Sequence, residues 1–293
     1  MNLTPIIKES FTQYAGAVLQ SRALPDVRDM LKPSARQIFY CLYTDKFTHN
    51  KPFKKTLKAI GSAMRMYIHG DSSCEGILMR SSQDFAMRYP YIEVEGSNGD
   101  PVLSGNWSAP RYTSSRLSPL SEYLFKDIEK ETIKEWRDNY DDTEQYPAIL
   151  PTKGFYGIVN GGMGIGVGAA FSCPQFNLKE VNEALIKLLD NPEISFDEIY
   201  CAPDFASGAI LLNEAEVKES LKKGEGLACK LRSVVNFDSG ERCLIATEIP
   251  YGVYTNTICD ELNKILEDVC NAKLTISKAR RIKQEKEEKK KNK

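Results

Sequence analysis

Two short helical patterns joined by a tight turn, with a strand-like stretch after them, constrain the fold of this chain more than any other feature. Residues 56–67 place apolar side chains at helical spacing from Leu57 onward. His69-Gly70-Asp71 forms a compact turn, and Asp71 or Ser72 can cap a second helix after it. Residues 89–95 then alternate like a strand, and a turn cluster follows at 96–101. This order predicts a helix-turn-helix with a β-wing, although any small α+β unit fits the same pattern equally well.

The rest of the chain divides into segments that differ in their predicted secondary structure. A helical arm is predicted at 1–20, because Leu24-Pro25 breaks the helix soon afterwards. The wing-bearing domain follows at 21–117, and a charged connecting helix is predicted at 118–146. Helices and strands are mixed at 147–276, where Asn177 caps one of the helices. The charged tail at 277–293 is expected to be disordered, and the predicted fold class is α+β.

Composition excludes several classes of protein. At 293 residues the chain is long enough for two domains. No apolar run approaches the ~20 residues that span a bilayer, and the first residues lack the pattern of a signal peptide. We therefore expect a cytoplasmic protein that engages no membrane. The eight cysteines form no C-x-x-C pair and only two histidines are present, so no structural metal site is expected.

Charge is distributed unevenly along the chain. Residues 20–116 carry 14 Lys and Arg against 9 Asp and Glu, whereas residues 117–150 carry 4 against 9. A basic first third is what a phosphate-binding face needs, although such a surplus often serves only solubility. Lys54, Lys55 and Lys58, interleaved with Phe53, form a cationic stretch at the start of the first predicted helix. This stretch either supplies the salt-dependent phosphate contacts of a DNA-binding protein or is only a solvated face.

Tyr112 is the candidate nucleophile, although one tyrosine among 14 is usually structural. A phenol of pKa about 10 is a poor nucleophile at neutral pH unless nearby positive charge favours the phenolate. Arg111 could provide that charge or grip a phosphate oxygen. Such a pair suits transesterification on a phosphodiester, which gives a phosphotyrosyl enzyme. Arg28 could clamp the phosphate bidentately, and His69 could donate a proton or a hydrogen bond to it, unless it serves only as a local hydrogen-bonding group.

A glycine run at 161–168 raises a competing interpretation. Gly164, Gly166 and Ala169 loosely satisfy the G-x-G-x-x-A pattern of a dinucleotide site. Such a site needs a helix to begin there, yet Ser172-Cys173-Pro174 interrupts the segment within a few residues. Close approach of the backbone to another backbone, or to DNA, accounts for the glycines better.

Seven motifs together carry a resemblance to a known family. They occur in order, at nearly constant spacing, from about residue 20 to residue 265: LPDVRDMLKP at 24–33, HGDS at 69–72, RYT at 111–113, DNYD at 138–141, LPTK at 150–153, VNG at 159–161 and EIPY at 248–251. This set resembles the A-type chains of bacterial DNA gyrase and topoisomerase IV. The resemblance implies a winged-helix domain at 21–117 that carries the active tyrosine, followed by a truncated, α/β tower-like domain at 147–276.

The resemblance also implies roles for individual residues. Tyr112 corresponds to the tyrosine that attacks DNA and stays on the 5′-phosphate, Arg111 to its neighbour, and Arg28 and His69 to residues that assist at the scissile phosphate. The positions that correspond to DNA-contacting ones are Lys54, Lys55, Lys58, Ser72, Arg80 and Cys173. Ser72 lies where quinolone sensitivity is determined, and Cys173 stands at the place of a DNA-intercalating isoleucine. The implied partners are double-stranded DNA and a B-type subunit, which would hold the Mg²⁺ and the ATP, in a heterotetramer containing a homodimer of this chain.

Three departures from the family pattern qualify this expectation. Tyr67 stands where the family commonly has a histidine, and Cys173 is a smaller wedge than isoleucine, so the DNA bend is weaker or made differently. The chain also ends before the coiled coil, exit gate and DNA-wrapping domain, as in a phage or mobile-element form, a split gene or a shortened chain. We therefore expect a breakage-reunion subunit suited to relaxation or decatenation rather than supercoiling. The alternatives are a degenerate winged-helix protein that binds DNA without cutting it and, from the glycine run alone, a nucleotide-dependent oxidoreductase.

Overall fold

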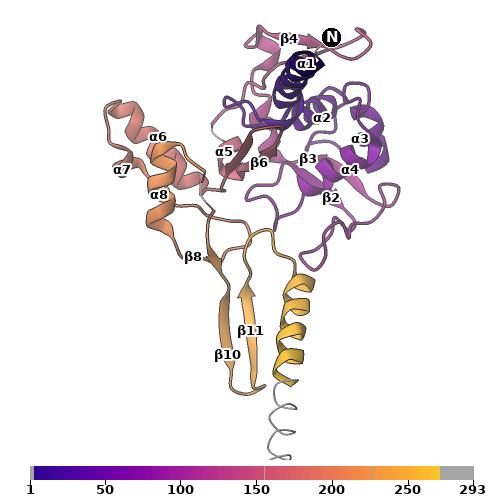
Figure 1. The fold of residues 1–293 in the computed structure, drawn as a ribbon. Coiled ribbons are helices and arrows are strands. Elements are labelled where there is room, and N and C mark those ends of the chain that lie inside the picture. Colours follow the sequence, from indigo (N-terminus) through magenta and orange to yellow (C-terminus); the bar gives the residue numbers. More distant parts are fainter. Residues whose placement is uncertain (1–2, 155, 227, 271–293) are drawn as a thin grey trace, which may run out of the picture. The chain divides into compact units, whose positions relative to one another are not determined.

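The computed structural model describes residues 3–154, 156–226 and 228–270, and it mixes helices and strands (Figure 1). The α+β class predicted from the sequence is therefore confirmed. Contacts divide the chain into two units. The first comprises residues up to Asp100 together with Gly105–Gly252, and the second comprises Pro101–Ser104 together with the chain from Val253 onward. No helix in the described ranges is long and apolar enough to cross a membrane.

Four helices open the first unit. The helix α1 (Leu3–Val18) continues into a π-helical turn, η1 (Leu19–Ala23). The helix α2 (Pro33–Thr44) begins with a proline, which suits the first helical position because the amide hydrogen there has no partner within the helix. The other two helices are α3 (Thr56–Ala63) and α4 (Asp71–Arg80).

Two details of the predicted helix pair were wrong. The helix predicted over residues 56–67 ends at Ala63, and the chain turns from Met64 onward. Neither Asp71 nor Ser72 caps the second helix: Gly70 is the N-cap residue, and the Asp71 carboxylate accepts a hydrogen bond from the adjacent Ser72 amide, 2.8 Å away. The short Asp71 side chain is thus already satisfied inside the first turn.

A three-stranded antiparallel sheet combines a short strand before α3 with two strands after α4. Its strands are β1 (Lys54–Lys55), β2 (Ile92–Glu95) and β3 (Ser114–Leu117), in the order β1-β3-β2. The register pairs Ile92 with Leu117 and Glu95 with Ser114. The strand predicted from residue 89 begins only at Ile92, because Pro90 has no amide hydrogen and the backbone of Tyr89 pairs with the Asn160 side chain instead.

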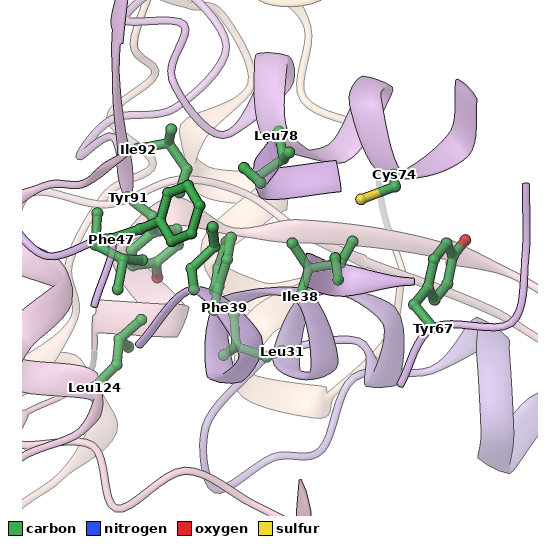
Figure 2. Close-up of a cluster of buried hydrophobic side chains, with 14 of the residues drawn as sticks. Leu31, Ile38, Phe39, Phe47, Tyr67, Cys74, Leu78, Tyr91, Ile92 and Leu124 are labelled. Atoms are coloured by element: carbon green, nitrogen blue, oxygen red, sulfur yellow. The ribbon is translucent and has the colours of Figure 1, made fainter. Parts of the chain in front are cut away.

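The core of the first unit lies between these helices and the sheet (Figure 2). Ile38, Phe39 and Leu42 of α2 are at most 1% exposed, and the Phe39 ring lies 5.4 Å from that of Tyr91. Leu78 of α4 and Ile92 of β2 belong to the same cluster. Burial of each large apolar side chain stabilises the fold by about 1.5–3 kcal/mol. This cluster therefore fixes α2, α3 and α4 against the sheet.

The connecting helix predicted at 118–146 is wrong. Two short 3₁₀ helices, η2 (Pro119–Leu124) and η3 (Ile128–Lys130), occupy its first part, and the strands β4 (Trp136–Asp138) and β5 (Gln145–Pro147) form a hairpin in the rest. The physical reason is local. Asp127 and Glu131, which flank η3, have φ values of 64° and 55°, a left-handed conformation that cannot continue a helix.

Within the described residues, the remaining chain of the first unit contains helices and three two-stranded antiparallel sheets. Its elements are α5 (Tyr156–Asn160), β6 (Gly162–Ile165), β7 (Ala170–Cys173), α6 (Leu178–Asp190), α7 (Phe196–Ile199), β8 (Ile210–Leu211), α8 (Glu214–Lys223), β9 (Leu231–Arg232), β10 (Val234–Asp238) and β11 (Cys243–Glu248). The strands pair as β6–β7, β8–β9 and β10–β11. The predicted cap of α6 is confirmed, since the Asn177 side chain accepts a hydrogen bond from the Lys179 amide at 3.0 Å.

In the second unit, residues 255–270 form a helix. Its first amide, that of Thr255, donates to the Pro101 carbonyl at 2.9 Å. The charged tail predicted at 277–293 lies outside the described residues.

Candidate active site

The loop that carries Arg111 and Tyr112 is fastened to the start of α3. The Thr56 amide donates to the Thr113 carbonyl at 3.0 Å, and the Leu57 amide donates to the Pro110 carbonyl at 3.2 Å. Thr113 is fully buried, and its hydroxyl donates to the Thr56 hydroxyl at 2.9 Å. The first amides of a helix lack partners within the helix, so the loop satisfies them and is held in place by them. Tyr112 therefore lies on a backbone that is anchored on both sides.

Tyr112 itself points into solvent. Its side chain is 66% exposed, and its amide donates to the Ala109 carbonyl at 2.9 Å. The Arg111 guanidinium lies over the Tyr112 ring, 4.9 Å from the ring centre, which is cation–π geometry. Within the described residues, the Tyr112 hydroxyl has no hydrogen-bond partner. An exposed phenol beside a cation, with its oxygen unengaged, can be approached by a phosphodiester.

Arg28 is held by its near neighbour Asp26. Its guanidinium makes two hydrogen bonds to that carboxylate, Nε to Oδ1 at 2.9 Å and Nη2 to Oδ2 at 2.7 Å. The Arg28 side chain is still 55% exposed. These bonds hold the pKa of the Asp26 carboxyl at about 2, below its ordinary value of 3.8, and they raise the pKa of Arg28. One edge of the predicted phosphate clamp is therefore already occupied by Asp26.

His69 lies beside an unexpected core residue. Its half-buried ring packs edge-on against the Tyr67 ring, with 5.0 Å between the ring centres. Tyr67 is only 4% exposed, and its hydroxyl pairs with that of Ser73 at 2.8 Å. Tyr67, noted above as a departure from the family pattern, is thus a structural tyrosine. In the part of the chain that the structure describes, no hydrogen bond, ion pair or ring contact joins Tyr112 to Arg28 or His69.

The predicted cationic stretch borders the tyrosine loop but is not uniform. Lys54 and Lys55 form β1 and pair with Ser115 and Ser114, immediately after the loop. The Lys54 ammonium donates to the Asp45 carbonyl at 2.8 Å and lies 4.3 Å from the centre of the Phe47 ring, so it serves the fold. Lys55 and Lys58 are exposed. Their side chains are therefore more accessible to a ligand than that of Lys54.

At the ends of α4, Ser72 and Arg80 are both exposed. Ser72 bonds only locally, to the Asp71 carboxylate through its amide and, at 3.5 Å, its hydroxyl. Arg80 is the last residue of the helix. Burial and the neighbouring Arg80 guanidinium both lower the pKa of Lys32, the residue before α2. Lys32 was not singled out from the sequence, because its position near Arg80 depends on the tertiary fold. In the sequence it is only a lysine before the proline that begins a helix.

The glycine run forms the hairpin β6–β7. Its register pairs Gly162 with Cys173 and Gly164 with Phe171. A side chain at Gly164 would collide with the Ala23 carbonyl, and one at Gly166 would collide with Leu19, so these glycines admit the end of the N-terminal arm. The dinucleotide interpretation is therefore wrong, because Gly164 lies in a strand and no helix begins there. Close approach of the backbone to another backbone, one of the two explanations offered for the glycines, is confirmed at Gly164.

Cys173, the predicted DNA wedge, is half-buried on this hairpin. Its thiol donates to the Pro174 carbonyl at 3.5 Å, and burial raises the pKa of the thiol to about 11. The residue therefore offers less apolar surface than a protruding wedge would.

Among the residues that the structure describes, no three His, Cys, Asp or Glu side chains converge in a way that could hold a metal ion.

Comparison with known proteins places these residues in context. The sequence model of the family of DNA gyrase/topoisomerase IV A-type chains matches residues 22–292. The chain is 40% identical to the A chain of DNA gyrase from Thermotoga maritima over 270 residues, which cover 89% of this chain and 33% of that protein. It is 37% identical to the A chain of DNA topoisomerase 4 from Staphylococcus epidermidis over 275 residues, 92% of this chain and 34% of that protein. The chain thus spans about a third of the length of these relatives.

Proposed function

Because this chain belongs to the family of DNA gyrase/topoisomerase IV A-type chains, we propose that it is the DNA breakage-reunion part of a type II topoisomerase. Tyr112 is the nucleophile in this proposal. The observation that carries it is the Arg111–Tyr112 pair, an exposed phenol with a guanidinium 4.9 Å from its ring, on a loop fastened to α3. A fixed backbone with a free hydroxyl is what a positioned nucleophile needs.

The reaction is a transesterification. The Tyr112 hydroxyl gives up its proton, and its oxygen attacks the phosphorus of a DNA phosphodiester. The bond from phosphorus to the 3′ oxygen breaks, that oxygen takes up a proton, and the 5′-phosphate stays on Tyr112. Reversal of the same steps reseals the strand, because the phosphotyrosyl ester keeps the energy of the broken bond. Two copies of the chain, each cutting one strand, make a transient double-strand break.

Other residues assist in binding the DNA phosphate. Arg111 stabilises the charge that develops on the phosphate oxygens. Arg28 offers the guanidinium edge that Asp26 leaves free, and His69 supplies a proton or a hydrogen bond at the 3′ oxygen. Neither touches Tyr112 in the unbound chain, and contacts of this kind often tighten only in the complex with substrate.

DNA is held by the rest of the first unit. We assign α2, α3, α4 and the sheet β1-β3-β2 to a winged-helix domain. Its exposed Lys55, Lys58 and Arg80 neutralise backbone phosphates, with a smaller share for Lys54, and Ser72 lies at the DNA-facing end of α4. Cys173 is at the expected wedge position, and its partial burial makes it a weak wedge. We assign residues 147–276 to the tower-like domain.

The partners are double-stranded DNA and a B-type subunit. We assign Mg²⁺ and ATP to that partner. Within the described residues, no three His, Cys, Asp or Glu side chains converge in a way that could hold a metal ion. The assembly is a heterotetramer that contains a homodimer of this chain, and its place is the bacterial cytoplasm, where the nucleoid lies.

Replacement of Tyr112 by Phe tests the assignment. The full chain is incubated with duplex DNA, Mg²⁺ and the gyrase B-type subunit of Thermotoga maritima, and denaturant then traps covalent adducts. Tyr112→Phe should bind DNA with wild-type affinity and form no adduct. The matched control Tyr14→Phe, at a tyrosine with 61% exposure, should form adducts like the wild type. Adducts that persist in Tyr112→Phe would show that another residue is the nucleophile.

A second candidate function is DNA binding without cleavage. The buried Tyr67 at an expected phosphate-side position and the half-buried Cys173 favour it. In that case the wild-type chain binds DNA tightly in the same assay and yields no 5′-linked adduct, with this B-type subunit or with that of Staphylococcus epidermidis topoisomerase 4.

A further inference from the structure

The segment Ala86–Tyr91 lies between α4, which ends at Arg80, and β2, and side chains from distant parts of the chain hydrogen-bond to its backbone. Its last residue, Tyr91, donates its amide to the Ser81 carbonyl at 2.9 Å, which ties it to the end of α4. Ile92 follows and begins β2. Any constraint on this segment is therefore passed to the strand beside the tyrosine loop.

Gln175 is one source of such constraint. It is 1% exposed, and its side-chain nitrogen donates to the Ala86 carbonyl at 2.9 Å and to the Asn160 carbonyl at 3.2 Å. Its side-chain oxygen accepts from the Ala206 amide at 2.8 Å. The donor nitrogen and the acceptor oxygen of this buried amide are both hydrogen-bonded. The amide therefore holds its partners in one arrangement, because any shift would leave a polar group unsatisfied in the interior.

Asn160 binds the same segment from the other side. Its side-chain oxygen accepts from the Tyr89 amide at 2.7 Å, and its side-chain nitrogen donates to the Tyr89 carbonyl at 2.8 Å. Asn160 ends α5 just before β6, and Gln175 follows β7 by two residues. Both ends of the β6–β7 hairpin are therefore hydrogen-bonded to Ala86–Tyr89.

The path from this segment to the nucleophile is short. β2 pairs with β3 so that Glu95 lies opposite Ser114, two residues after Tyr112. Gly96, which follows β2, lies so close to Thr113 that an added side-chain carbon would be 3.2 Å from the threonine methyl group. A displacement of β2 would therefore move the backbone that carries Tyr112.

We propose that Gln175 is a positioning residue that couples the β6–β7 hairpin to the strand pair carrying Tyr112, so that DNA held at the hairpin presents a defined phosphate to the nucleophile. The inference rests on the proposed function and goes beyond it, because Gln175 touches neither Tyr112 nor any predicted DNA contact. Its amide sets the register between two DNA-handling parts of one chain.

Tyr251 provides the matched control. Its hydroxyl donates to the same Ala86 carbonyl at 2.8 Å, but it comes from the end of the first unit and has no part in the hairpin. Gln175→Met keeps the side-chain length and removes all three hydrogen bonds. Tyr251→Phe removes the hydroxyl and its bond to the shared acceptor, and it keeps the stacking of the ring on Phe205.

The test uses the full chain with duplex DNA, Mg²⁺ and the gyrase B-type subunit of Thermotoga maritima. Five quantities are measured: the melting temperature, the DNA affinity by fluorescence anisotropy, the DNA bend by energy transfer between labelled duplex ends, and both the yield and the nucleotide position of adducts at saturating DNA. Gln175→Met should bind and bend DNA within about threefold of wild type. Its adduct yield should fall roughly 10- to 100-fold, the loss expected for an ångström-scale misplacement, and the remaining cuts should spread to neighbouring phosphates. Tyr251→Phe should cut at the wild-type positions with near wild-type yield.

Several outcomes would overturn the proposal. Wild-type yield and cut positions in Gln175→Met would show that the amide does not position the DNA. An equal defect in Tyr251→Phe would assign the effect to support of the Ala86 carbonyl, and a parallel loss of binding and melting temperature would make Gln175 merely structural. If Gln175→Met fails to fold, Gln175→Glu, which keeps the acceptor facing Ala206, is measured in the same way. A wild-type chain that forms no adduct removes the proposed function itself, whereas normal wild-type cleavage with normal Gln175→Met cleavage removes only the coupling.

Discussion

Replacement of Arg36 by Met tests the buried ion pair that shapes the loop before α2. Asp29 and Arg36 form this pair, and their side chains are 0% and 4% exposed. The Asp29 carboxylate accepts from Arg36 Nε at 2.6 Å and Nη2 at 2.8 Å, and from the amides of Leu31 and Leu150 at 3.0 Å. Arg36→Met removes the two guanidinium bonds to Asp29 and a third to the Leu31 carbonyl, and it leaves the buried carboxylate with only the two amide donors.

The expected cost follows from that geometry. Removal of one partner of a buried, hydrogen-bonded ion pair destabilises a protein by about 3–5 kcal/mol, because the remaining charge is desolvated and uncompensated. Asp29→Asn combined with Arg36→Met should cost less than Arg36→Met alone, because the uncompensated charge is removed. The matched control is Arg137→Met, whose ion pair with Glu135 has side chains 50% and 59% exposed. It should cost at most about 1 kcal/mol, as exposed pairs do.

Urea unfolding followed by tryptophan fluorescence measures these differences, since Trp107 and Trp136 both lie in the first unit. The variants must share one dependence of unfolding free energy on urea for their midpoints to be compared. An Arg36→Met cost below about 1 kcal/mol, or one equal to that of Arg137→Met, would refute the reasoning, because the pair would then contribute no more than a solvated one.

Three further outcomes are expected. Lys58→Ala should lower the slope of log affinity for duplex DNA against log salt by about 0.9, the value for one phosphate contact, whereas Lys54→Ala should change it less because its ammonium is engaged by the fold; binding titrations at several salt concentrations measure both. Gly164→Ala should loosen the N-terminal arm and speed its proteolysis, since the new methyl group meets a backbone carbonyl, whereas Gly162→Ala has room and should behave as wild type. The Asp26 carboxyl should titrate near pH 2 by NMR. Because its pKa in the folded chain lies below its ordinary value of 3.8, ionised Asp26 stabilises the fold above about pH 4, and this stabilisation is lost as the pH falls through 2. Its size is under about 1 kcal/mol, because the site is partly exposed.

Local patterns in the sequence predicted the elements they code for. The apolar spacing from Leu57 and the cap at Asn177 depend on neighbours within one or two helical turns, and both helices form. The prediction of a connecting helix was wrong because contacts distant in sequence decide the structure there. The composition of residues 118–146 suits a helix, but residues at Asp127 and Glu131 adopt left-handed backbone, and the Ser118 and Ser121 hydroxyls bond the carbonyls of Pro90 and Tyr91 across the core. Tertiary contacts of this kind override helix propensity.

In the candidate site, too, the features that depend on sequence neighbours could be predicted and those that depend on distant residues could not. The Arg111–Tyr112 pair is adjacent in sequence, so its chemistry could be inferred directly. The ion pair of Arg28 with Asp26 is also local, since the two residues are two positions apart. The sequence does not show, however, that the carboxylate occupies one edge of the guanidinium. Gln175 carried no signal at all. Its partners, Ala86, Asn160 and Ala206, are between 15 and 89 residues distant, and only the fold brings them together.

The unbound site is thus a set of groups that are each held by a local partner rather than by one another. Tyr112 is fixed through the backbone of its loop, Arg28 through Asp26, and His69 against Tyr67. Under the proposed function, a phosphodiester would be the common partner of these groups. It would accept hydrogen bonds from the free edge of the Arg28 guanidinium, from Arg111 and from the His69 imidazole, and it would meet the phenol oxygen of Tyr112. A nucleophile whose oxygen is free but whose backbone is fixed reacts only when the substrate is brought to it in register. The buried amide of Gln175 lies on the connection between the two parts of the chain that would set that register.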